Sequence, residues 1–360
     1  MSLVKPIGVG ILGLGRSGMN IHGDAIRQSP VHYCVKAVYD PIAERCTESA
    51  HALDANACNS VQELLSDDDI ELVIVASSNA DHAPQAIRAL NAGKHVLCEK
   101  PFGLTLTDVD AMMEASKING KLLQPFQQRR YEPDFLKVKQ VCDSGRLGSI
   151  ELIRICWHGF KRRWDWQTLT AMSGGALNNN GPHPIDHAMQ LFGESDPKVW
   201  CEMKHCLCSG DAEDYLKIIL YGDGPTIEIE LIDVAAYAQD RWWICGKAGA
   251  LRGDANRLEW KWVEWSTMPA RPVSSQPTPD RSYNQEDLTW HTDSWEPELV
   301  ADVGGGAAPA TQPTLDLYAG LYAAIRDGKP QQVTAESVRR NVQVMEKCRA
   351  AAAHIGWPGV

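Results

Sequence analysis

Short apolar runs alternate with amphipathic stretches along the first third of the chain. The apolar runs are Ile7–Leu12, Tyr33–Tyr39, Leu72–Ala76, His95–Cys98 and Lys121–Gln124. Between them lie segments with helical periodicity, such as Pro84–Asn91 and Asp108–Lys117. Strands that alternate with helices in this way are typical of βαβ units, in which parallel strands form a sheet between two layers of helices. The pattern predicts a doubly wound α/β domain over residues 1–126.

The pattern changes after about residue 150. Three segments, Tyr215–Tyr221, Thr226–Ile232 and Arg257–Trp265, alternate polar and apolar residues. A period of two is typical of strands that have one covered face and one wetter face. Residues 127–360 are therefore predicted to form an α+β domain with a largely antiparallel open sheet. This domain is expected to bind substrate and to mediate oligomerisation.

The C-terminal part combines a long loop with two predicted helices. Residues 266–313 are rich in Pro, Ser and Gly and include Gly304-Gly305-Gly306, so this loop is expected to be a lid, an oligomer arm or a mobile segment. Thr314–Asp327 and Ala335–Ala353 are predicted to be helices. The second helix could pack back on the first domain, which leaves the domain boundary soft.

Composition and charge narrow the class of protein. The formal net charge is −11, which disfavours nucleic acid and anionic membranes as partners, because both require a basic surface. The chain has neither an apolar run long enough to span a bilayer nor a recognisable secretory signal. The eleven scattered cysteines are expected to be reduced thiols, and the expected location is cytoplasmic.

A glycine motif follows the first predicted strand, at Gly13-Leu14-Gly15-Arg16-Ser17-Gly18. The first glycine permits a tight turn, the second permits a pyrophosphate to approach the backbone, and the third permits close packing of helix on strand. The following helix would direct free N–H groups of its first turn, from Arg16 and Ser17, toward the anion. The motif therefore predicts a Rossmann domain that binds a dinucleotide.

Asp40 ends the second predicted strand, 22 residues after Gly18. A carboxylate at this place can accept a hydrogen bond from a ribose 2′-hydroxyl and would repel a 2′-phosphate. The expected cofactor is therefore NAD, with NADP less favoured. Arg16 and Arg45 weaken this preference, since both could pair with a phosphate.

Glu99-Lys100-Pro101 directly follows the strand His95–Cys98, where ligands bind in doubly wound sheets. Together with the glycine motif, Asp40 and Ser77-Ser78-Asn79-Ala80-Asp81-His82, it resembles the glucose–fructose oxidoreductase/inositol dehydrogenase (Gfo/Idh/MocA) family. A later segment, Gly174 to Asp186, resembles the second motif of that family. The resemblance implies hydride transfer between NAD(P) and a sugar, cyclitol or related polyol. The cofactor contacts expected beyond the glycine motif and Asp40 are Ser77, Asn79, His82, Glu99, Lys100 and Gln128.

In this family the lysine of the first motif touches substrate and cofactor, and the histidine of the second motif is the usual acid/base. The matching residues are Lys100 and His183. One residue departs from the pattern: the aspartate four residues before the histidine is Asn179. An amide can orient a hydroxyl but cannot accept a proton as a base. We therefore assign His183 as general base, Lys100 as the group that polarises the reacting oxygen, and Asn179 as the holder of a neighbouring hydroxyl.

The substrate is expected to contact Arg163, Asp165 and Trp166, because an indole can stack on a sugar ring while the charged groups bind hydroxyls. Asp186, the further aspartate of the second motif, is expected to contribute as well. Gln128 and Arg130 are candidates to face the same cleft.

Two further expectations concern metals and assembly. His183 and His187 have the i, i+4 spacing of zinc ligands, but Pro184 stands where a metalloprotease helix carries glutamate, so no metal site is expected. An open sheet with an apolar face commonly pairs with a second copy, and the expected assembly is a homodimer or homotetramer through the second domain.

Two other functions stay open beside the dehydrogenase. One is a non-catalytic NAD and sugar sensor or regulator, which Asn179 keeps in consideration. The other is a glycoside hydrolase or lyase that works through transient oxidation with retained NAD.

Overall fold

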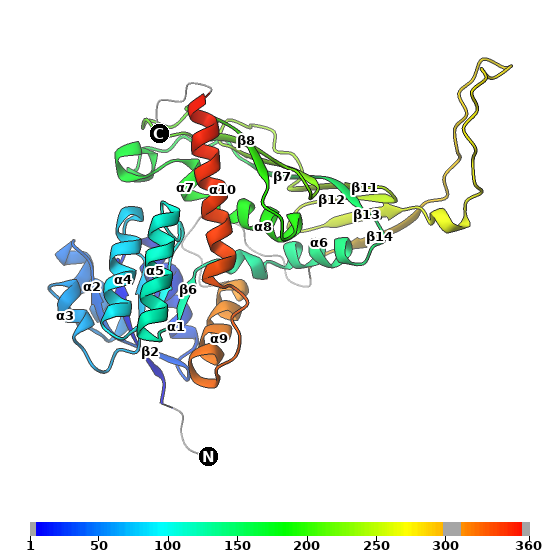
Figure 1. The fold of residues 1–360 in the computed structure, drawn as a ribbon. Helices are drawn as coiled ribbons and strands as arrows, with labels where there is room; N and C mark the ends of the chain where they lie inside the picture. The colour runs from blue at the N-terminus through cyan, green and yellow to red at the C-terminus, as the bar shows by residue number, and fades with distance from the viewer. Residues whose placement is uncertain (1–4, 298–310, 355–360) are drawn as a thin grey trace.

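A computed structural model of the chain describes residues 5–297 and 311–354, in two domains that each contain one sheet (Figure 1). The first sheet has six parallel strands in the order β3-β2-β1-β4-β5-β6. Its strands are β1 (Ile7–Leu12), β2 (Tyr33–Tyr39), β3 (Asn56–Ala57), β4 (Leu72–Val75), β5 (His95–Cys98) and β6 (Leu123–Pro125). The predicted Rossmann topology is confirmed, with the strand order reversing between β1 and β4.

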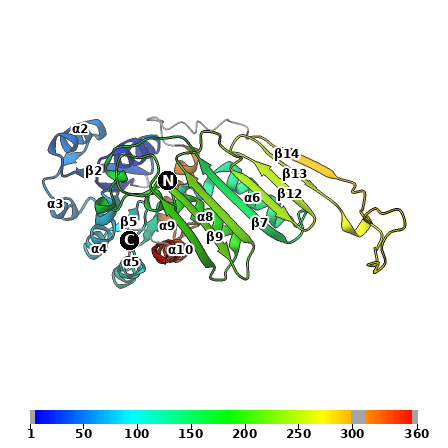
Figure 2. The same cartoon turned by 90° about the horizontal axis from the view of Figure 1, so that it is seen from above.

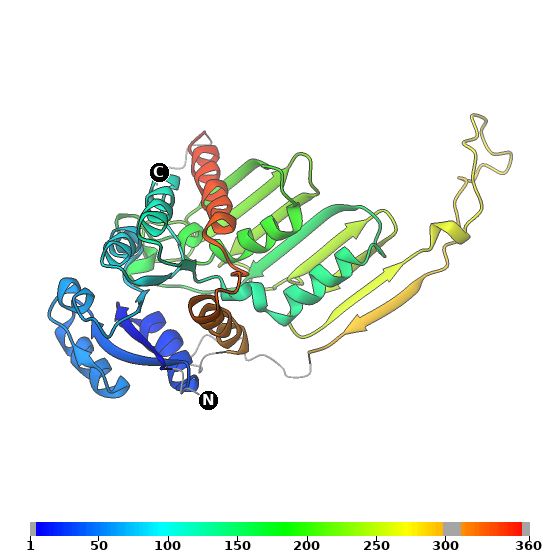
Figure 3. The same cartoon turned by 60° about the horizontal axis from the view of Figure 1, so that its bottom comes forward.

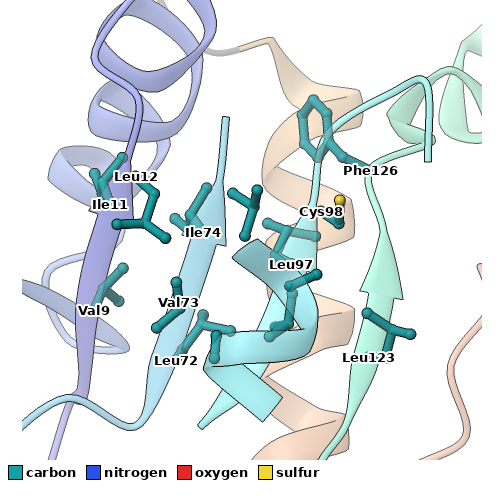
Figure 4. Close-up of a cluster of buried hydrophobic side chains, with 14 of the residues drawn as sticks. Val9, Ile11, Leu12, Leu72, Val73, Ile74, Leu97, Cys98, Leu123 and Phe126 are labelled. Atoms are coloured by element: carbon teal, nitrogen blue, oxygen red, sulfur yellow. The ribbon is translucent and has the colours of Figure 1, made fainter. Parts of the chain in front are cut away.

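Helices flank this sheet. They are η1 (Ser17–Gly23), α1 (Asp24–Gln28), α2 (Ala43–Leu53), α3 (Val61–Leu65), η2 (Asn79–Asp81), α4 (His82–Asn91) and α5 (Leu106–Asn119). All residues of β1 and β4 are buried, which explains their unbroken apolar sequences. Figure 4 shows the resulting core, in which Val9 and Ile11 of β1 lie beside Ile74 of β4.

The second sheet has eight strands in the order β14-β13-β12-β11-β7-β10-β9-β8. These are β7 (Ile150–His158), β8 (Lys198–Lys204), β9 (Tyr215–Tyr221), β10 (Thr226–Ile232), β11 (Trp242–Gly246), β12 (Gly249–Gly253), β13 (Leu258–Trp262) and β14 (His291–Trp295). Every pairing is antiparallel except that of β7 with β10, which confirms the largely antiparallel prediction.

Helices cover one face of this sheet, as Figures 2 and 3 show. They are α6 (Pro133–Asp143), α8 (Pro182–Phe192) and the C-terminal half of α10 (Ala335–His354). Short elements η3 (Gln128–Tyr131), η4 (Trp166–Thr168), η5 (Thr170–Met172) and α7 (Ala176–Asn179) lie near the junction of the domains. The other face of the sheet is left uncovered within the described chain.

The last two helices return to the first domain. Helix α9 (Gln312–Asp327) buries Leu317 and Leu321 in the core of the first domain. Helix α10 places Val342 in that core and Met345 in the core of the second domain, so one helix joins both. Figure 1 shows α10 running along the junction. The polypeptide after residue 311 therefore belongs partly to the first domain, although it follows the second in sequence.

An extended hairpin projects from the second sheet. Residues 263–290 connect β13 to β14, with the short helix η6 (Trp265–Thr267) near the base, and reach well beyond the sheet (Figure 1). Gly304-Gly305-Gly306 of the predicted long loop lies outside the described residues. Within 5–297 and 311–354, none of the helices combines the length and apolar character needed to cross a membrane.

Candidate functional site

The glycine turn after β1 has the geometry of a phosphate cradle. Gly13 has φ +89°, and a Cβ there would lie 2.5 Å from the Ala76 carbonyl oxygen. A Cβ on Gly18 would lie 1.9 Å from the Gly13 carbonyl oxygen. A Cβ on Gly15 would meet nothing within 4 Å, so that side of the turn is open. The first and third glycines therefore serve packing, and the second leaves room for a ligand, as a dinucleotide requires.

Asp40 lies at the carboxyl end of β2, beside this turn. Its carboxylate accepts hydrogen bonds from the backbone N–H groups of Leu14 (2.7 Å) and Ile42 (2.9 Å). Arg45 lies 3.5 Å from the same carboxylate. A carboxylate can accept further hydrogen bonds, so these contacts orient Asp40 without excluding a ribose hydroxyl.

Three predicted cofactor residues, Ser77, Asn79 and His82, lie in the segment after β4, and each has different surroundings. The Ser77 hydroxyl is buried and has no hydrogen-bond partner among the described residues, as expected for a group that serves a ligand. Asn79 instead donates to the Ser173 carbonyl at 2.8 Å and so joins the two domains. The buried His82 ring lies between the carbonyl oxygens of Pro101 (2.8 Å) and Ser77 (3.2 Å), which makes it a brace between two loops.

Lys100 stands at the carboxyl end of β5 and reaches into the second domain. Its Nζ donates to the backbone carbonyl of Asn179 at 2.7 Å and lies 3.5 Å from the Asn179 side-chain oxygen. Burial lowers the pKa of Lys100 to about 8, with Glu99 opposing the change and Arg129 adding to it. A lysine in this range is partly neutral near physiological pH and can exchange a proton with a substrate.

His183 opens helix α8, directly after Pro182. The Gln127 amide donates to the Pro182 carbonyl (2.8 Å), which fixes its oxygen as the acceptor facing His183 Nδ1 at 3.2 Å. Nδ1 therefore carries the proton and Nε2 carries the lone pair. Burial, followed by the positive charges of Arg129 and Lys100, lowers the pKa of His183 well below its usual value. The imidazole is thus a neutral hydrogen-bond acceptor at neutral pH, and a weaker base than the sequence alone predicted.

An aromatic and cationic group packs around His183. The Trp157 indole stacks on the His183 ring, with centroids 5.9 Å apart. The guanidinium groups of Arg129 and Arg241 lie 4.7 and 5.1 Å from the Trp157 ring. Gln127, Arg129 and Trp157 were not predicted from the sequence. Gln127 and Arg129 could have been found from their position directly after β6, whereas Trp157 lies within β7 and gave no such signal.

A pocket lies on the other side of Asn179. Its walls include Arg163, Gln167, Glu213 and Asp233, side chains that can bind hydroxyl groups. Arg163 forms two hydrogen bonds to Asp165 (2.8 and 2.9 Å), and Asp165 in turn caps η4. Of the predicted substrate residues in this segment, Arg163 lines the pocket, whereas Asp165 orients Arg163. The Trp166 side chain is partly exposed beside the pocket rather than in its lining.

Asp186 and Arg130 have other surroundings in the structure than the cleft that was predicted for them. Asp186 forms a buried two-point ion pair with Arg130 (2.6 and 2.7 Å) and accepts from Asn341 of α10 (2.7 Å). Asp186 and Arg130 therefore anchor helices, and the predicted substrate contact of Asp186 is corrected, because its oxygens are occupied by protein donors.

Gln128 has a buried side-chain oxygen with no partner in the described chain, which leaves it available to a ligand.

His187 is also turned away from the site. Its Nε2 is 2.9 Å from the Arg129 carbonyl oxygen, and its ring stacks on Phe135 at 4.1 Å. Through these contacts His187 packs into the core of the second domain, and its Nε2 faces the Arg129 carbonyl rather than a site shared with His183.

Comparisons with known proteins agree with this geometry. Residues 7–127 match the family model described as "Oxidoreductase family, NAD-binding Rossmann fold", and residues 135–252 match the "GFO/IDH/MocA C-terminal domain". An uncharacterized oxidoreductase of Schizosaccharomyces pombe is 31% identical over 223 residues, which are 61% of this chain and 60% of that protein. An inositol 2-dehydrogenase of Salmonella typhimurium is 37% identical over 237 residues, 64% of this chain and 68% of that enzyme.

Solved structures share the complete fold. An NAD-binding protein from Listeria innocua has a TM-score of 0.79 at 24% identity, covering 98% of this chain and 96% of that one. The WlbA dehydrogenase from Bordetella pertussis, in complex with NADH and UDP-GlcNAcA, has a TM-score of 0.75 at 19% identity, covering 97% of each chain. At these identities the likeness concerns the fold alone. The two family models together cover more than half of the chain, which therefore belongs to the GFO/IDH/MocA oxidoreductase family, with an NAD-binding Rossmann domain.

Proposed function

We propose that this protein is an NAD-dependent dehydrogenase that oxidises a secondary alcohol of a sugar, cyclitol or related polyol. The observation that carries the proposal is the buried amine of Lys100, held against Asn179 at the domain junction with a pKa of about 8. An amine with this pKa is suited to remove the hydroxyl proton of an alcohol near neutral pH.

Lys100, His183 and Asn179 have different roles in the transfer of the hydroxyl proton. NAD held at the glycine turn and Asp40 would supply the hydride acceptor for the carbinol carbon. Lys100 in its neutral form accepts the hydroxyl proton, and its ammonium form returns a proton in the reverse reaction. His183 offers the Nε2 lone pair as an acceptor to a neighbouring hydroxyl of the substrate, because the single proton of the reacting hydroxyl goes to Lys100. Asn179 contributes its backbone carbonyl, which holds Nζ in place without adding a charge.

The substrate class rests on the pocket beside Asn179. Amide, guanidinium and carboxylate groups line it, and such a mixture of donors and acceptors suits a molecule with several hydroxyls. The inositol 2-dehydrogenase of Salmonella and a scyllo-inositol 2-dehydrogenase (NADP(+)) of Bacillus subtilis, 30% identical over 53% of this chain, act on cyclitols by their names. We extend that chemical class, but no particular substrate, to this protein.

The choice of NAD over NADP rests on Asp40. Its buried carboxylate, held by two backbone donors, stands where a 2′-phosphate would add a second negative charge. Arg45 makes one contact with Asp40, at 3.5 Å, and its side chain is otherwise half-exposed.

The uncovered face of the second sheet supports self-association. Trp200 on β8 and Trp243 on β11 are 40% and 39% exposed on this face. The Trp243 indole lies beside the ion pair of Arg154 with Glu228, and exposed tryptophan together with arginine is typical of protein interfaces, which closed symmetric pairing would bury. We propose a homo-oligomer through this face; Trp243→Glu should lower the mass measured by light scattering, and an unchanged mass would contradict it.

The activity is tested by following NADH formation with a panel of cyclitols, aldoses and other polyols. We expect turnover with at least one of them, its loss in Lys100→Met, and its retention in Lys117→Met, which removes an exposed lysine of α5. No turnover despite intact binding of NAD and polyol would favour the sensor. Cleavage of a glycoside without net NADH would favour the redox-assisted hydrolase.

A further inference from the structure

A buried hydrogen-bonded chain of side chains begins at Glu99, directly before Lys100. The backbone N–H of Lys100 donates to Glu99 Oε2 at 2.9 Å. Glu99 Oε1 is 3.3 Å from His22 Nε2, and His22 Nδ1 is 2.8 Å from the Tyr318 hydroxyl. Glu99, His22 and Tyr318 are 4%, 0% and 0% exposed, so the chain has no access to water.

The members of this chain come from parts far apart in sequence. His22 lies in η1, directly after the glycine turn, and its ring packs on Phe126 with centroids 4.5 Å apart. Phe126 is labelled in Figure 4 just beyond the end of β6. Tyr318 belongs to α9, and the Tyr33 hydroxyl donates to its backbone carbonyl at 2.7 Å. Helix α9 thus supplies a group to the inner side of the proposed catalytic lysine.

The chemistry of the chain fixes its direction. An ionised carboxylate only accepts hydrogen bonds, so His22 Nε2–H donates to Glu99. Burial acts to raise the pKa of Glu99, but the hydrogen bond and charge of His22, together with Lys100, outweigh it and lower that pKa to about 2. The Tyr318 hydroxyl occupies Nδ1, which keeps the imidazole from turning away from the carboxylate.

The negative charge of Glu99 favours the ammonium form of Lys100, whereas the other strong influences on that amine disfavour it. Burial and the three cations Arg16, Arg129 and Arg163 all disfavour the ammonium, and Glu99 is the one anion among the strongest influences. Asn179 is neutral, whereas the family resemblance would place a carboxylate there. The other groups that face this pair are His183 on the side of Lys100, and His82, Cys98 and Tyr318 on the side of Glu99.

We propose that His22 and Tyr318 are positioning residues, which hold the Glu99 carboxylate as a fixed anion against the backbone N–H of Lys100 and thereby set the protonation of the Lys100 amine. The inference rests on the proposed function only in assuming that the Lys100 amine transfers a proton during the reaction. The arrangement itself concerns Lys100 whether or not a substrate turns over.

The test reads Lys100 directly, by 13C NMR titration of protein labelled at the lysine ε-carbon, with the signal assigned by its loss in Lys100→Met. In the parent protein we expect a midpoint near pH 8. His22→Leu removes the donor to Glu99, the carboxylate becomes easier to protonate, and the ammonium loses its anion. The Lys100 midpoint should therefore fall to about 7 or below.

Three further variants separate positioning from mere packing. Tyr318→Phe removes only the hydroxyl and should lower the midpoint in the same direction, by less. His22→Gln keeps an N–H that can reach Glu99 and should restore the midpoint toward that of the parent protein. Tyr322→Phe removes a tyrosine hydroxyl from the same helix, where the ring lies tilted against His32 with centroids 4.2 Å apart, and should leave the titration of Lys100 unchanged.

The outcomes distinguish this inference from the proposed function. Folded His22→Leu and Tyr318→Phe proteins with the parent titration of Lys100 would overturn the inference. If His22→Leu does not fold, Tyr318→Phe decides alone. If the titrations change as expected while no polyol is oxidised by the parent protein, the proposed function fails and the positioning role stands. If turnover is present, the pH midpoint of kcat/KM should move with the NMR midpoint.

Discussion

The Nζ atom of Lys100 is held by the backbone carbonyl of Asn179, 2.7 Å away, and only weakly by its side chain, at 3.5 Å. A backbone acceptor is indifferent to whether residue 179 is asparagine or aspartate. The departure from the family motif therefore leaves the position of the lysine intact and removes one negative charge from its surroundings.

The rate of oxidation should rise with pH through about 8, where Lys100 changes from ammonium to amine. Burial lowers the pKa of this lysine, and only the neutral amine can accept the hydroxyl proton. The reduction of a ketone by NADH needs the ammonium and should show the opposite dependence. Profiles of kcat/KM in both directions check this, and parallel profiles would contradict the assignment.

Asn179→Asp should move that midpoint upward. The substitution places a carboxylate near Nζ, which stabilises the ammonium and raises the pKa of Lys100. At pH 7 the oxidation rate should fall by about tenfold, since less amine is neutral, and it should recover at higher pH. A uniform loss at every pH would instead indicate that the side-chain amide itself binds the substrate.

The Gln127 amide is expected to matter through His183. Gln127→Leu removes the acceptor for Nδ1–H, so the ring is free to choose the other tautomer or to rotate. We expect kcat to fall by about 10²-fold. Gln127→Glu keeps an acceptor at the same place and should retain more activity than Gln127→Leu. Stopped-flow measurement of the hydride-transfer step checks both, and equal activities would count against the orientation role.

Asp40 should control the choice of cofactor. Asp40→Asn removes the charge and keeps one of the two acceptor oxygens, so one of the Leu14 and Ile42 N–H groups loses its partner. NAD binding should weaken by about tenfold, the scale of one hydrogen bond to a charged group. NADP binding should strengthen, since repulsion is removed and Arg45 is released. Dissociation constants from quenching of tryptophan fluorescence test this, and equal affinity of the parent protein for both cofactors would refute the assignment.

The Arg130–Asp186 pair should act on stability. Asp186→Ala leaves the Arg130 guanidinium buried without its carboxylate, which costs about 3–5 kcal/mol of unfolding free energy. The exposed pair of Arg339 with Asp110 is the matched control, and Asp110→Ala should cost under about 1 kcal/mol. Urea unfolding measures both. A stable Asp186→Ala protein with a raised KM would restore the substrate contact predicted from the sequence.

Much of the fold can be predicted from short stretches of the sequence. Strands such as Ile7–Leu12 and Tyr215–Tyr221 have the bounds that their periodicity predicts, because a period of two and an unbroken apolar run each reflect burial by near neighbours. The glycine turn is local in part: Gly18 is required by a contact with Gly13 in the same βα unit, whereas Gly13 is also required by the close approach of Ala76 after β4. Lys100 and His183 were recognisable through motifs that place them at the ends of strands and helices.

What the tertiary structure decided is which side chains meet. Asp186 and Arg130 looked like groups facing a cleft, but they face each other, because α8 and η3 pack together. The pKa of His183 lies well below that of a free imidazole because three long-range neighbours and burial disfavour its charge. His22 lies 77 residues from Glu99 and 296 from Tyr318, so no spacing rule could have joined them. Sequence periodicity reports burial by neighbours along the chain, whereas protonation and pairing depend on groups that only the folded chain brings within a few ångströms.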